Sequence, residues 1–232
     1  MNKHLAIVTG HSRGLGAAVA DQLHAQGWQV LGISRKPRAA PFEEWAADLA
    51  DPLPVAERLQ AWLAERQPAR LLLINNAALV TDPGPVAGVP LAALSASLRV
   101  GLEAVVLLSG AVLAGAARCP DLRIVNVSSG LGRRPMAAAA PYCAVKAGMD
   151  MFSRALQLEG VRVTSLAPGI IDTDMQVQLR SGDPSRFPDV ARFVDFKASG
   201  ALQSAEDTAR RLIDFALRPD FDREPLSDLR QV

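Results

Sequence analysis

The stretch Ser129–Lys146, SGLGRRPMAAAAPYCAVK, decides what the rest of the chain is expected to be. Its first residue, Ser129, follows an apolar run, and Tyr142 comes thirteen residues later. Proline is common in the first turn of a helix, so Pro141 predicts that a helix begins here. Tyr142 and Lys146 would then lie one turn apart on the same helix face.

This spacing indicates a proton-transfer site. A phenol has a pKa near 10, and a neighbouring ammonium lowers that pKa because it favours the phenolate. Tyr142 beside Lys146 would therefore exchange a proton with a carbonyl or alcohol oxygen. Ser129 would hold the same oxygen, with Ser128 as the second choice. A Y-x-x-x-K pair alone also fits a solvated helix face, so other motifs must support the site.

A glycine-rich turn follows the first apolar run of the chain. Leu5–Val8 predicts a buried strand, TGHSRGLG at Thr9–Gly16 follows it, and an alanine-rich helical segment extends to about Gly27. Strand, glycine turn and helix are the opening of a dinucleotide-binding βαβ unit, in which the helix N-terminus receives a pyrophosphate. The glycines, spaced G-x-x-x-G-x-G, also fit a purely structural turn.

The end of the second strand predicts which dinucleotide binds. Trp28–Ser34 indicates this strand, and the residues after it are Arg35 and Lys36 rather than a carboxylate. A carboxylate there would bind a ribose diol, whereas basic residues suit a 2′-phosphate. With Arg13 closing on the same phosphate, the sequence favours NADP(H) over NAD. The alternative is a solvated basic loop.

The remaining segments alternate between strands and helices and predict a single α/β domain over residues 1–232. Pro, charged residues and phenylalanines at about 180–200 interrupt the alternation and predict a substrate lid. The expected strands are Glu44–Ala47, Leu71–Ile74, Leu122–Val127, Val161–Leu166 and one within Asp220–Val232, and the expected helices are Pro54–Gln67, Leu91–Ala117, Tyr142–Leu158 and one from Ser204 to Leu217.

Composition excludes several classes of function. The chain has 232 residues, 49% hydrophobic and 21% charged, and a net charge of +1, which argues against nucleic acid as a partner. Two cysteines form no disulfide framework, so a cytoplasmic setting is expected. Three scattered histidines lack metal-ligand spacing, so no metal site is expected. The apolar run Ala104–Ala117 is shorter than the roughly 20 residues that span a bilayer, which favours a buried helix over a membrane segment.

Together these motifs resemble the short-chain dehydrogenase/reductase family over essentially the whole chain. They are Thr9–Gly16, N-N-A at Asn75–Ala77, the Ser129, Tyr142 and Lys146 set, and P-G-x-x-x-T at Pro168–Thr173. V-S-S-G at 127–130, A-x-Y-C at 140–143 and K-A-G-M-D-M-F at 146–152 are similar to benzil reductases, which are close to sepiapterin reductases. The resemblance implies a doubly wound Rossmann domain with a parallel sheet and helices on both faces.

The resemblance also implies roles for individual residues. Tyr142 would donate the proton in reduction, Ser129 would orient the carbonyl oxygen, and Lys146 would hold the nicotinamide ribose. Asp48 also fits an ordinary helix cap. The implied cofactor-binding residues are Gly10, Ser12, Arg13, Gly14, Leu15 and Gly16 at the phosphates, Arg35 at the 2′-phosphate, Asp48 and Leu49 at the adenine, Asn75, Asn76 and Ala77 at the adenosine ribose and central cofactor, and Pro168, Gly169, Ile171 and Thr173 at the nicotinamide.

One departure from the family pattern concerns proton supply. The family usually has an asparagine in the helix after N-N-A-G, where it supports a water-mediated path to the lysine. Here Gly101 takes that place, and Ala78 replaces the last glycine of N-N-A-G. Water or Ser97 would have to substitute for the missing amide.

The sequence therefore predicts an NADPH-dependent carbonyl reductase that converts a ketone or dicarbonyl, of the benzil or sepiapterin type, to an alcohol. The alternatives are an NAD-linked alcohol dehydrogenase and a non-catalytic protein that binds or senses NADPH. The apolar segments Leu91–Ala117 and Tyr142–Leu158 favour a homodimer or homotetramer.

Overall fold

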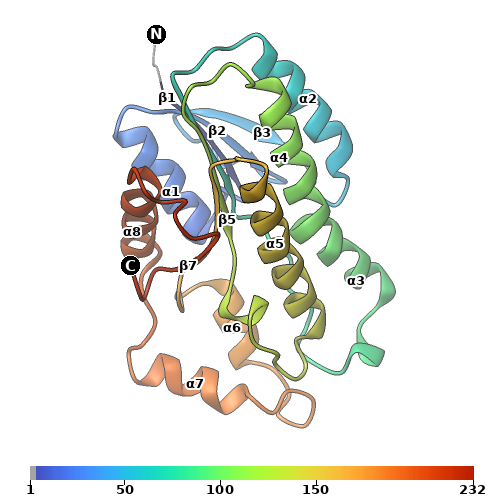
Figure 1. The fold of residues 1–232 in the computed structure, drawn as a ribbon. Helices are drawn as coiled ribbons and strands as arrows, with labels where there is room; N and C mark the ends of the chain where they lie inside the picture. The colour runs from blue at the N-terminus through green and yellow to red at the C-terminus, as the bar shows by residue number, and fades with distance from the viewer. Residues whose placement is uncertain (1–3) are drawn as a thin grey trace.

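Seven short runs of mostly apolar residues form one parallel sheet in the computed structural model, which describes residues 4–232 (Figure 1). The runs lack regular alternation because both faces of each central strand are buried. The strands are β1 (His4–Thr9), β2 (Gln29–Ser34), β3 (Glu43–Ala46), β4 (Arg70–Asn75), β5 (Leu122–Val127), β6 (Val163–Ala167) and β7 (Leu226–Asp228).

Helices cover both faces of this sheet. The helices α1 and α8 lie on one side, and α2, α4 and α5 lie on the other (Figure 1). Short η1 (Val86–Gly88) and η3 (Gly130–Gly132) lie in loops. The helices are α1 (Gly14–Ala25), α2 (Pro52–Ala64), α3 (Leu91–Leu98), α4 (Ala104–Gly115), α5 (Ala140–Leu158), α6 (Asp174–Arg180), α7 (Val190–Ala198) and α8 (Ala205–Leu217).

The strand order is β3-β2-β1-β4-β5-β6-β7, and every strand pairing is parallel. The chain leaves β1 in one direction and returns to its other side at β4. Open sheets of this kind bind ligands at the carboxyl ends of the strands beside such a reversal. The predicted fold class, a doubly wound parallel α/β sheet, is confirmed.

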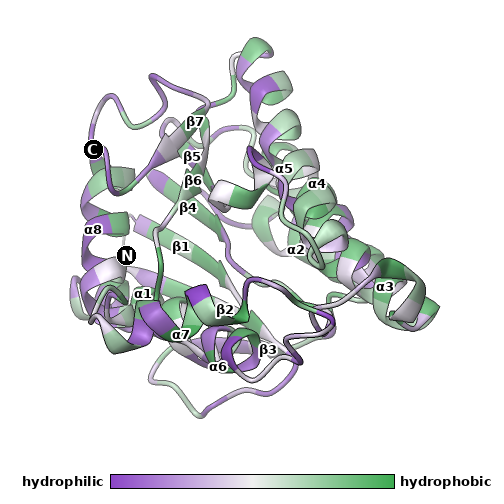
Figure 2. Cartoon of the chain, turned by 90° about the horizontal axis from the view of Figure 1, so that it is seen from below, coloured by the Kyte–Doolittle hydropathy of each residue, from purple (hydrophilic) through white to green (hydrophobic). Residues whose placement is uncertain are grey.

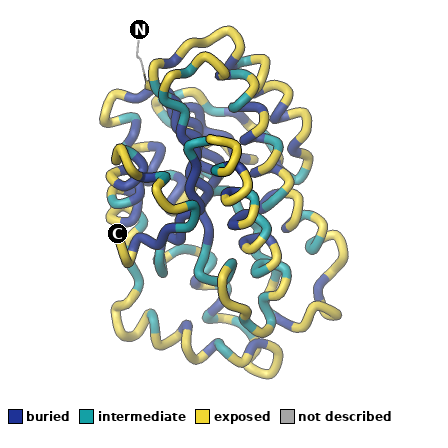
Figure 3. Tube along the Cα trace, viewed as in Figure 1, coloured by how far each residue is buried: buried dark blue, intermediate teal, exposed yellow. Residues whose placement is uncertain are grey.

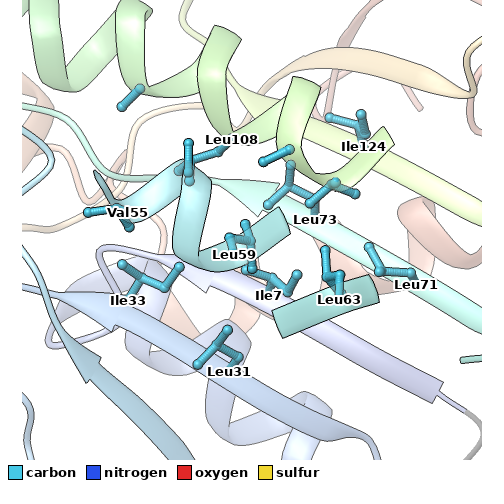
Figure 4. Packing of buried hydrophobic residues seen from close by; sticks show 14 of the residues in the cluster. Ile7, Leu31, Ile33, Val55, Leu59, Leu63, Leu71, Leu73, Leu108 and Ile124 are labelled. Carbon is cyan, nitrogen blue, oxygen red and sulfur yellow. The ribbon is translucent and has the colours of Figure 1, made fainter. Parts of the chain in front are cut away.

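Two apolar cores hold the layers together. On the side of α2 and α4, Ile7, Leu59 and Leu73 interlock with no exposed surface (Figure 4). On the side of α1 and α8, the neighbouring strand residues Val8 and Ile74 pack in the second core. Successive strand side chains point to opposite faces, so each strand supplies both cores. Figure 3 shows the strands as the buried centre of the molecule.

The boundaries differ from the predicted ones by a few residues. Strand β6 begins at Val163 rather than Val161, and α2 begins at Pro52 rather than Pro54. The sheet ends in the three-residue β7, which lies within the predicted range Asp220–Val232. Such offsets arise because hydrogen-bond partners, rather than side-chain pattern, set where an element ends.

The apolar helix is longer than the run Ala104–Ala117, from which the sequence analysis argued against a membrane segment. Leu91–Gly115 is one continuous 25-residue helix in which the π-helical turn η2 (Arg99–Glu103) joins α3 to α4. Length and composition alone would let it cross a bilayer, which corrects the estimate based on the shorter run. A helix in the core of a globular protein can be equally long and apolar, and Leu108 and Val112 on this helix are fully buried.

The segment predicted as a lid contains helical structure at the carboxyl edge of the sheet. Helices α6 and α7 lie across that edge (Figures 1 and 2). They share a separate apolar cluster, built around Leu179, Phe187, Val190 and Phe193, and Phe187 is completely buried. The segment is therefore packed on its own small core beside the main domain.

Close approach of α2 and α4 depends on Gly115, because a Cβ there would lie 2.7 Å from the Gln60 carbonyl oxygen. We expect Gly115→Ala to lower the free energy of unfolding by about 1–3 kcal/mol. Gly110→Ala is the control on the same helix, because a Cβ there meets no atom within 4 Å. It should be neutral or stabilising by up to about 1 kcal/mol. Urea denaturation would measure both, and equal effects would contradict the packing argument.

Candidate active site

Ser129, Tyr142 and Lys146 come together at the carboxyl end of β5. Ser129 follows this strand directly, and Tyr142 and Lys146 lie one turn apart near the start of α5, which opens with Pro141 in its first turn. The Lys146 Nζ lies 5.6 Å from the centre of the Tyr142 ring and donates a hydrogen bond to the Val127 carbonyl oxygen at 2.6 Å. The lysine thus links the helix to the end of the strand.

The two adjacent serines have different surroundings. Ser129 is close enough to Tyr142 for a hydrogen bond that favours the phenolate. Its Oγ also accepts a hydrogen bond from the Leu131 N–H at 3.2 Å. Ser128 is buried, and its hydroxyl donates to the Asp150 carboxylate at 2.5 Å. Of the two, only Ser129 is placed to share an oxygen atom with Tyr142.

The pKa of Tyr142 moves in the direction opposite to the predicted one. Burial is the largest influence, and it raises the pKa above the ordinary value of a phenol, whereas the Ser129 hydrogen bond lowers it only in part. Lys146 is not among the groups that lower this pKa, and its Nζ donates to the Val127 carbonyl. The prediction that the ammonium lowers the pKa is therefore wrong here. Tyr142 is a neutral phenol at pH 7, the form that can donate a proton.

The side chain of Lys146 is almost completely buried. Burial lowers its pKa from 10.5 to about 8, and the negative charge of Asp150, one turn further along α5, opposes this effect. Desolvation disfavours the charged form of an amine unless a counter-charge offsets it. Lys146 is therefore mostly protonated at pH 7, but its pKa lies only about one unit above that pH.

Asp150 is a residue of the site that the sequence reasoning missed. Its carboxylate accepts hydrogen bonds from the hydroxyls of Ser128 and Ser165, the latter at 2.7 Å, and from the Arg133 Nε at 3.3 Å. These partners come from the end of β5, from β6 and from the loop after η3. The signal was an acidic residue four positions after Lys146, on the same helix face as Tyr142 and Lys146.

The glycine turn has the geometry of a phosphate cradle. Gly10 and Gly14 have φ values of 69° and 54°, which a residue with a side chain rarely adopts. A Cβ on Gly16 would lie 2.4 Å from the Gly10 carbonyl oxygen, so only glycine lets α1 approach the turn. Gly14 is also the first residue of α1, whose unpaired N–H groups face the turn. The turn therefore fits a dinucleotide pyrophosphate. Ser12 and Leu15 lie within it.

The two asparagines at the end of β4 bind different partners. The Asn76 amide donates to the Thr9 carbonyl at 2.9 Å and so ties the end of β4 to the glycine turn, as expected for loop-bridging amides. The Thr9 hydroxyl accepts from the backbone of Asn76 and Ala77. Asn75 instead donates to the Asn126 side chain at 2.8 Å inside the sheet, so its amide faces the core rather than the edge.

The basic residues near the end of β2 are not equally available. Arg13 forms an ion pair with Asp174 at the start of α6, at 2.6 Å, and both side chains are exposed. Arg38 pairs with Asp21 on α1. Arg35 and Lys36 are exposed and have no side-chain hydrogen bond to any residue in 4–232. They are the two cations left to receive a phosphate.

Asp48 and Leu49 follow β3 at the same edge. The Asp48 carboxylate accepts a hydrogen bond from the Ala50 N–H at 3.0 Å, and Asp51, not Asp48, is the residue at the N-cap of α2. The alternative that Asp48 caps a helix is therefore wrong, because the N-cap position of the helix lies three residues later. Leu49 is buried in the core.

The segment after β6 leads from the sheet to α6. Pro168 opens it, Gly169 has a φ of 92°, and Ile171 pairs with Gln203 in an isolated bridge. Thr173 occupies the N-cap of α6, and its methyl group would lie 3.5 Å from a Cβ on Gly14. This segment and the glycine turn therefore border the same space.

Gly101 lies in the π-helical turn, buried against α5. A Cβ there would lie 2.4 Å from a methyl group of Val145, so the position has no room for the family's asparagine. Ser97, one turn earlier, is buried, and its hydroxyl has no hydrogen-bond partner among the described residues. Ser97 is thus a buried polar group one turn before Gly101 on the same helix.

A small apolar pocket adjoins Tyr142. It is lined by Val80, Thr81, Pro83, Leu131, Met136, Ala138, Ala139, Met175 and Leu179 together with Tyr142. A larger hollow, of about 200 Å³, lies between the C-terminal ends of α2 and α4, at the opposite edge of the sheet. Within residues 4–232, no group of three or more His, Cys, Asp or Glu side chains could hold a metal ion.

This chain is similar to known proteins over most of its length. The family profile described as short chain dehydrogenase matches residues 4–184. Benzil reductase ((S)-benzoin forming) of Bacillus subtilis (strain 168) is 30% identical over 222 residues, which cover 90% of this chain and 91% of that protein. Sepiapterin reductase of Xenopus tropicalis is 31% identical over 244 residues, with 90% of each chain covered.

Solved structures agree with these relatives. A short-chain dehydrogenase/reductase from Burkholderia vietnamiensis is 31% identical with a TM-score of 0.66, and the match covers 99% of this chain and 100% of that one. A metagenomic short-chain oxidoreductase in complex with NADP is 25% identical with a TM-score of 0.69, and the match covers 98% and 95% of the two chains.

The buried lysine predicts a specific pH dependence of stability. Its pKa is about 8 in the folded chain, against 10.5 for a lysine exposed to water, so between these pH values the unfolded chain binds more protons and stability rises with pH. Below pH 8 the desolvation cost is fully present. Relative to Lys146→Met, the wild-type protein should gain about 2 kcal/mol between pH 7 and pH 9.5. Urea unfolding of both proteins at both pH values measures this gain, and parallel pH profiles would contradict it.

Proposed function

We propose that this chain, which belongs to the short-chain dehydrogenase family, is an NADPH-dependent carbonyl reductase that converts a ketone or dicarbonyl to an alcohol. The observation that carries the proposal is the Tyr142 phenol beside Ser129, at the wall of an apolar pocket. This arrangement offers a proton donor and a second hydrogen-bonding group to one carbonyl oxygen.

In the proposed reaction, each residue has a separate task. The nicotinamide cofactor supplies the hydride. Tyr142 donates its proton to the substrate oxygen, and the Ser129 hydroxyl holds that oxygen in place. Lys146 presents its ammonium to the nicotinamide ribose. Asp150 keeps the loop that carries Ser129 in position through Ser128.

Support for NADPH over NADH comes from the end of β2. Arg35 and Lys36 are exposed there without side-chain partners among residues 4–232, and no carboxylate follows the strand to accept a ribose diol. Guanidinium and ammonium groups bind phosphate by charge-assisted hydrogen bonds. The glycine turn supplies the pyrophosphate cradle, because Gly10, Gly14 and Gly16 leave the space that side chains would fill.

The pocket favours an apolar carbonyl substrate. Thr81 and Tyr142 carry the only side-chain polar groups in its lining, and no charged residue contributes to it. Burying a pterin ring there would leave its amide groups without partners, at a cost in free energy. An aryl ketone or diketone, the type named for the Bacillus relatives, has only its carbonyl oxygens to satisfy. We therefore place benzil-type substrates ahead of sepiapterin.

Exposed apolar side chains on two helices support self-association in the cytoplasm. Leu91 and Leu98 on α3 and Met151 and Leu158 on α5 are exposed, Leu158 by 91%. Exposed apolar side chains gain free energy when a partner buries them. A homodimer or homotetramer would cover it.

A binding-only role is the second candidate, and Gly101 is the observation that favours it. Val145 fills the space of the usual asparagine, so proton supply to Lys146 depends on water or on Ser97. A protein that binds NADPH tightly and consumes none across benzil, sepiapterin, aryl ketones and a steroid ketone would fit this role instead.

Tyr142→Phe tests the proton donor directly. Removing the hydroxyl should lower kcat for NADPH-dependent reduction of benzil by about 10²–10⁴-fold, because general acid catalysis contributes that much. NADPH binding, followed by fluorescence, should change little. Ser129→Ala should also lower kcat, by a smaller factor. Wild-type turnover by the phenylalanine variant would refute the role of Tyr142.

Arg35→Asp tests the cofactor. The variant should raise the KM for NADPH at least about tenfold, since it replaces a phosphate-binding cation by a repelling anion. The KM for NADH should change little or fall. Arg118→Asp makes the same change in net charge at an exposed site on the opposite edge, and it should leave both constants unchanged. An equal effect of Arg35→Asp on both cofactors would favour the NAD-linked alcohol dehydrogenase.

A further inference from the structure

A buried histidine in the glycine turn contacts a glutamate from a different strand. His11 has no exposed surface, and its Nε2 lies 2.6 Å from the Glu44 Oε1 on β3. The pKa of Glu44 is lowered to about 2, so the carboxylate is ionised and Nε2 must carry the proton that it donates. Neither side chain takes part in the proposed chemistry of the pocket.

Glu44 also holds the basic loop that follows β2. Its carboxylate accepts hydrogen bonds from the N–H groups of Arg38 at 3.0 Å and Ala40 at 2.8 Å. The residue between them, Ala39, has a φ of 57°, a left-handed conformation that costs about 1–2 kcal/mol for a residue with a side chain. Two N–H groups that converge on one anion form an anion-binding concavity. The carboxylate thus stabilises a loop shape that the chain would not keep alone.

The surroundings of the imidazole indicate that its hydrogen bond to Glu44, rather than the volume it fills, explains a histidine at this position. The ring lies against Gly32 in β2, and a Cβ on that glycine would come within 2.5 Å of two ring atoms. Gly32 in mid-strand is explained by this close approach. The other nitrogen, Nδ1, is buried with no partner among residues 4–232, a cost of about 1–3 kcal/mol. An apolar side chain would fill the space without that cost but could not bind Glu44.

We infer that His11 and Glu44 are positioning residues for cofactor selectivity: together they fasten the glycine turn to the basic loop and so hold Arg35 and Lys36 where a 2′-phosphate would bind. The inference rests on the proposed use of NADPH. The pair joins the two segments that would receive the two phosphate groups of that cofactor, the pyrophosphate and the 2′-phosphate. Arg38 is not the binding cation, because Asp21 engages its guanidinium.

Charge and positioning predict opposite effects for the loss of Glu44. Arg35, Lys36 and Arg38 are part of the loop, and Glu44 is the anion that accepts hydrogen bonds from its backbone. By charge alone, removing this anion should strengthen binding of a phosphate. If the carboxylate instead orders the loop, its removal should weaken that binding. The sign of the change therefore separates the two explanations.

Glu44→Gln is the first test. All three partners of the carboxylate are donors: His11 and Arg38 bind one oxygen, and Ala40 binds the other. Glutamine keeps one acceptor oxygen, and its amide nitrogen cannot accept, so at least one bond that holds the loop or the His11 ring is lost. The dissociation constant for NADPH, measured by fluorescence titration, should rise about tenfold, and that for NADH less than about threefold. Hydrogen exchange at Arg38 and Ala40 should accelerate. Glu43→Gln, the neighbouring carboxylate on the opposite strand face, is the control of equal charge and should change neither constant.

His11 is tested with two variants that separate packing from hydrogen bonding. In the double variant His11→Ala/Gly32→Ala, the new Cβ of residue 32 occupies part of the space that the imidazole leaves, so the fold is supported while the bond to Glu44 is lost. This variant should lose NADPH selectivity as Glu44→Gln does. His11→Gln keeps a donor near Glu44 and should recover at least part of the selectivity.

The outcomes distinguish this inference from the proposed function. A wild-type protein that binds NADPH and NADH equally would overturn both. A selective wild type whose Glu44→Gln and double variants keep their selectivity, or bind NADPH more tightly, would overturn the positioning role and leave the proposed function standing. Equal losses in Glu43→Gln and Glu44→Gln would also overturn it.

Discussion

The hydrogen bond from the Lys146 ammonium to the Val127 carbonyl is the constraint on which the candidate site depends. A buried cation is stable only if nearby acceptors and anions replace the water that it has lost. Val127 provides the acceptor at the end of β5, and Asp150 provides the anion one turn along α5. The helix must therefore lie against the end of this strand, and Tyr142, one turn before Lys146, is placed beside Ser129 as a consequence.

The same edge of the sheet is held together by hydrogen bonds between loops that follow different strands. Asn76 ties the end of β4 to the glycine turn after β1, and Glu44 ties that turn, through His11, to the loop after β2. Parallel strands place all of these loops at one edge, so side chains far apart in sequence can bond. The glycines make this possible by removing Cβ atoms where backbones meet, as at Gly16 and Gly32.

The sequence was sufficient for features that depend on spacing within one element or on element order. Examples are the helix that carries Tyr142 and Lys146, the strand–turn–helix around Gly10 and the doubly wound sheet. It was insufficient for features that depend on packing. The direction of the Tyr142 pKa follows from burial, and the His11–Glu44 contact joins residues 33 positions apart that approach only when β2 and β3 pair in register. The periodicity of the sequence predicts neither the burial of a single side chain nor a contact between distant residues.

Gly101 shows how packing can replace a motif residue without loss of the surrounding geometry. The π-helical turn inserts extra backbone at this point, and Val145, the residue before Lys146, fills the space against it. The lysine side chain still reaches Val127, so the position of the ammonium does not require a side chain at residue 101. Neither glycine nor valine has a side-chain donor or acceptor, so no side chain at this point can hydrogen-bond toward Lys146. The buried Ser97 hydroxyl on the same helix has no hydrogen-bond partner among the described residues, so a polar group with unused hydrogen-bonding capacity lies one turn before the position that Val145 fills.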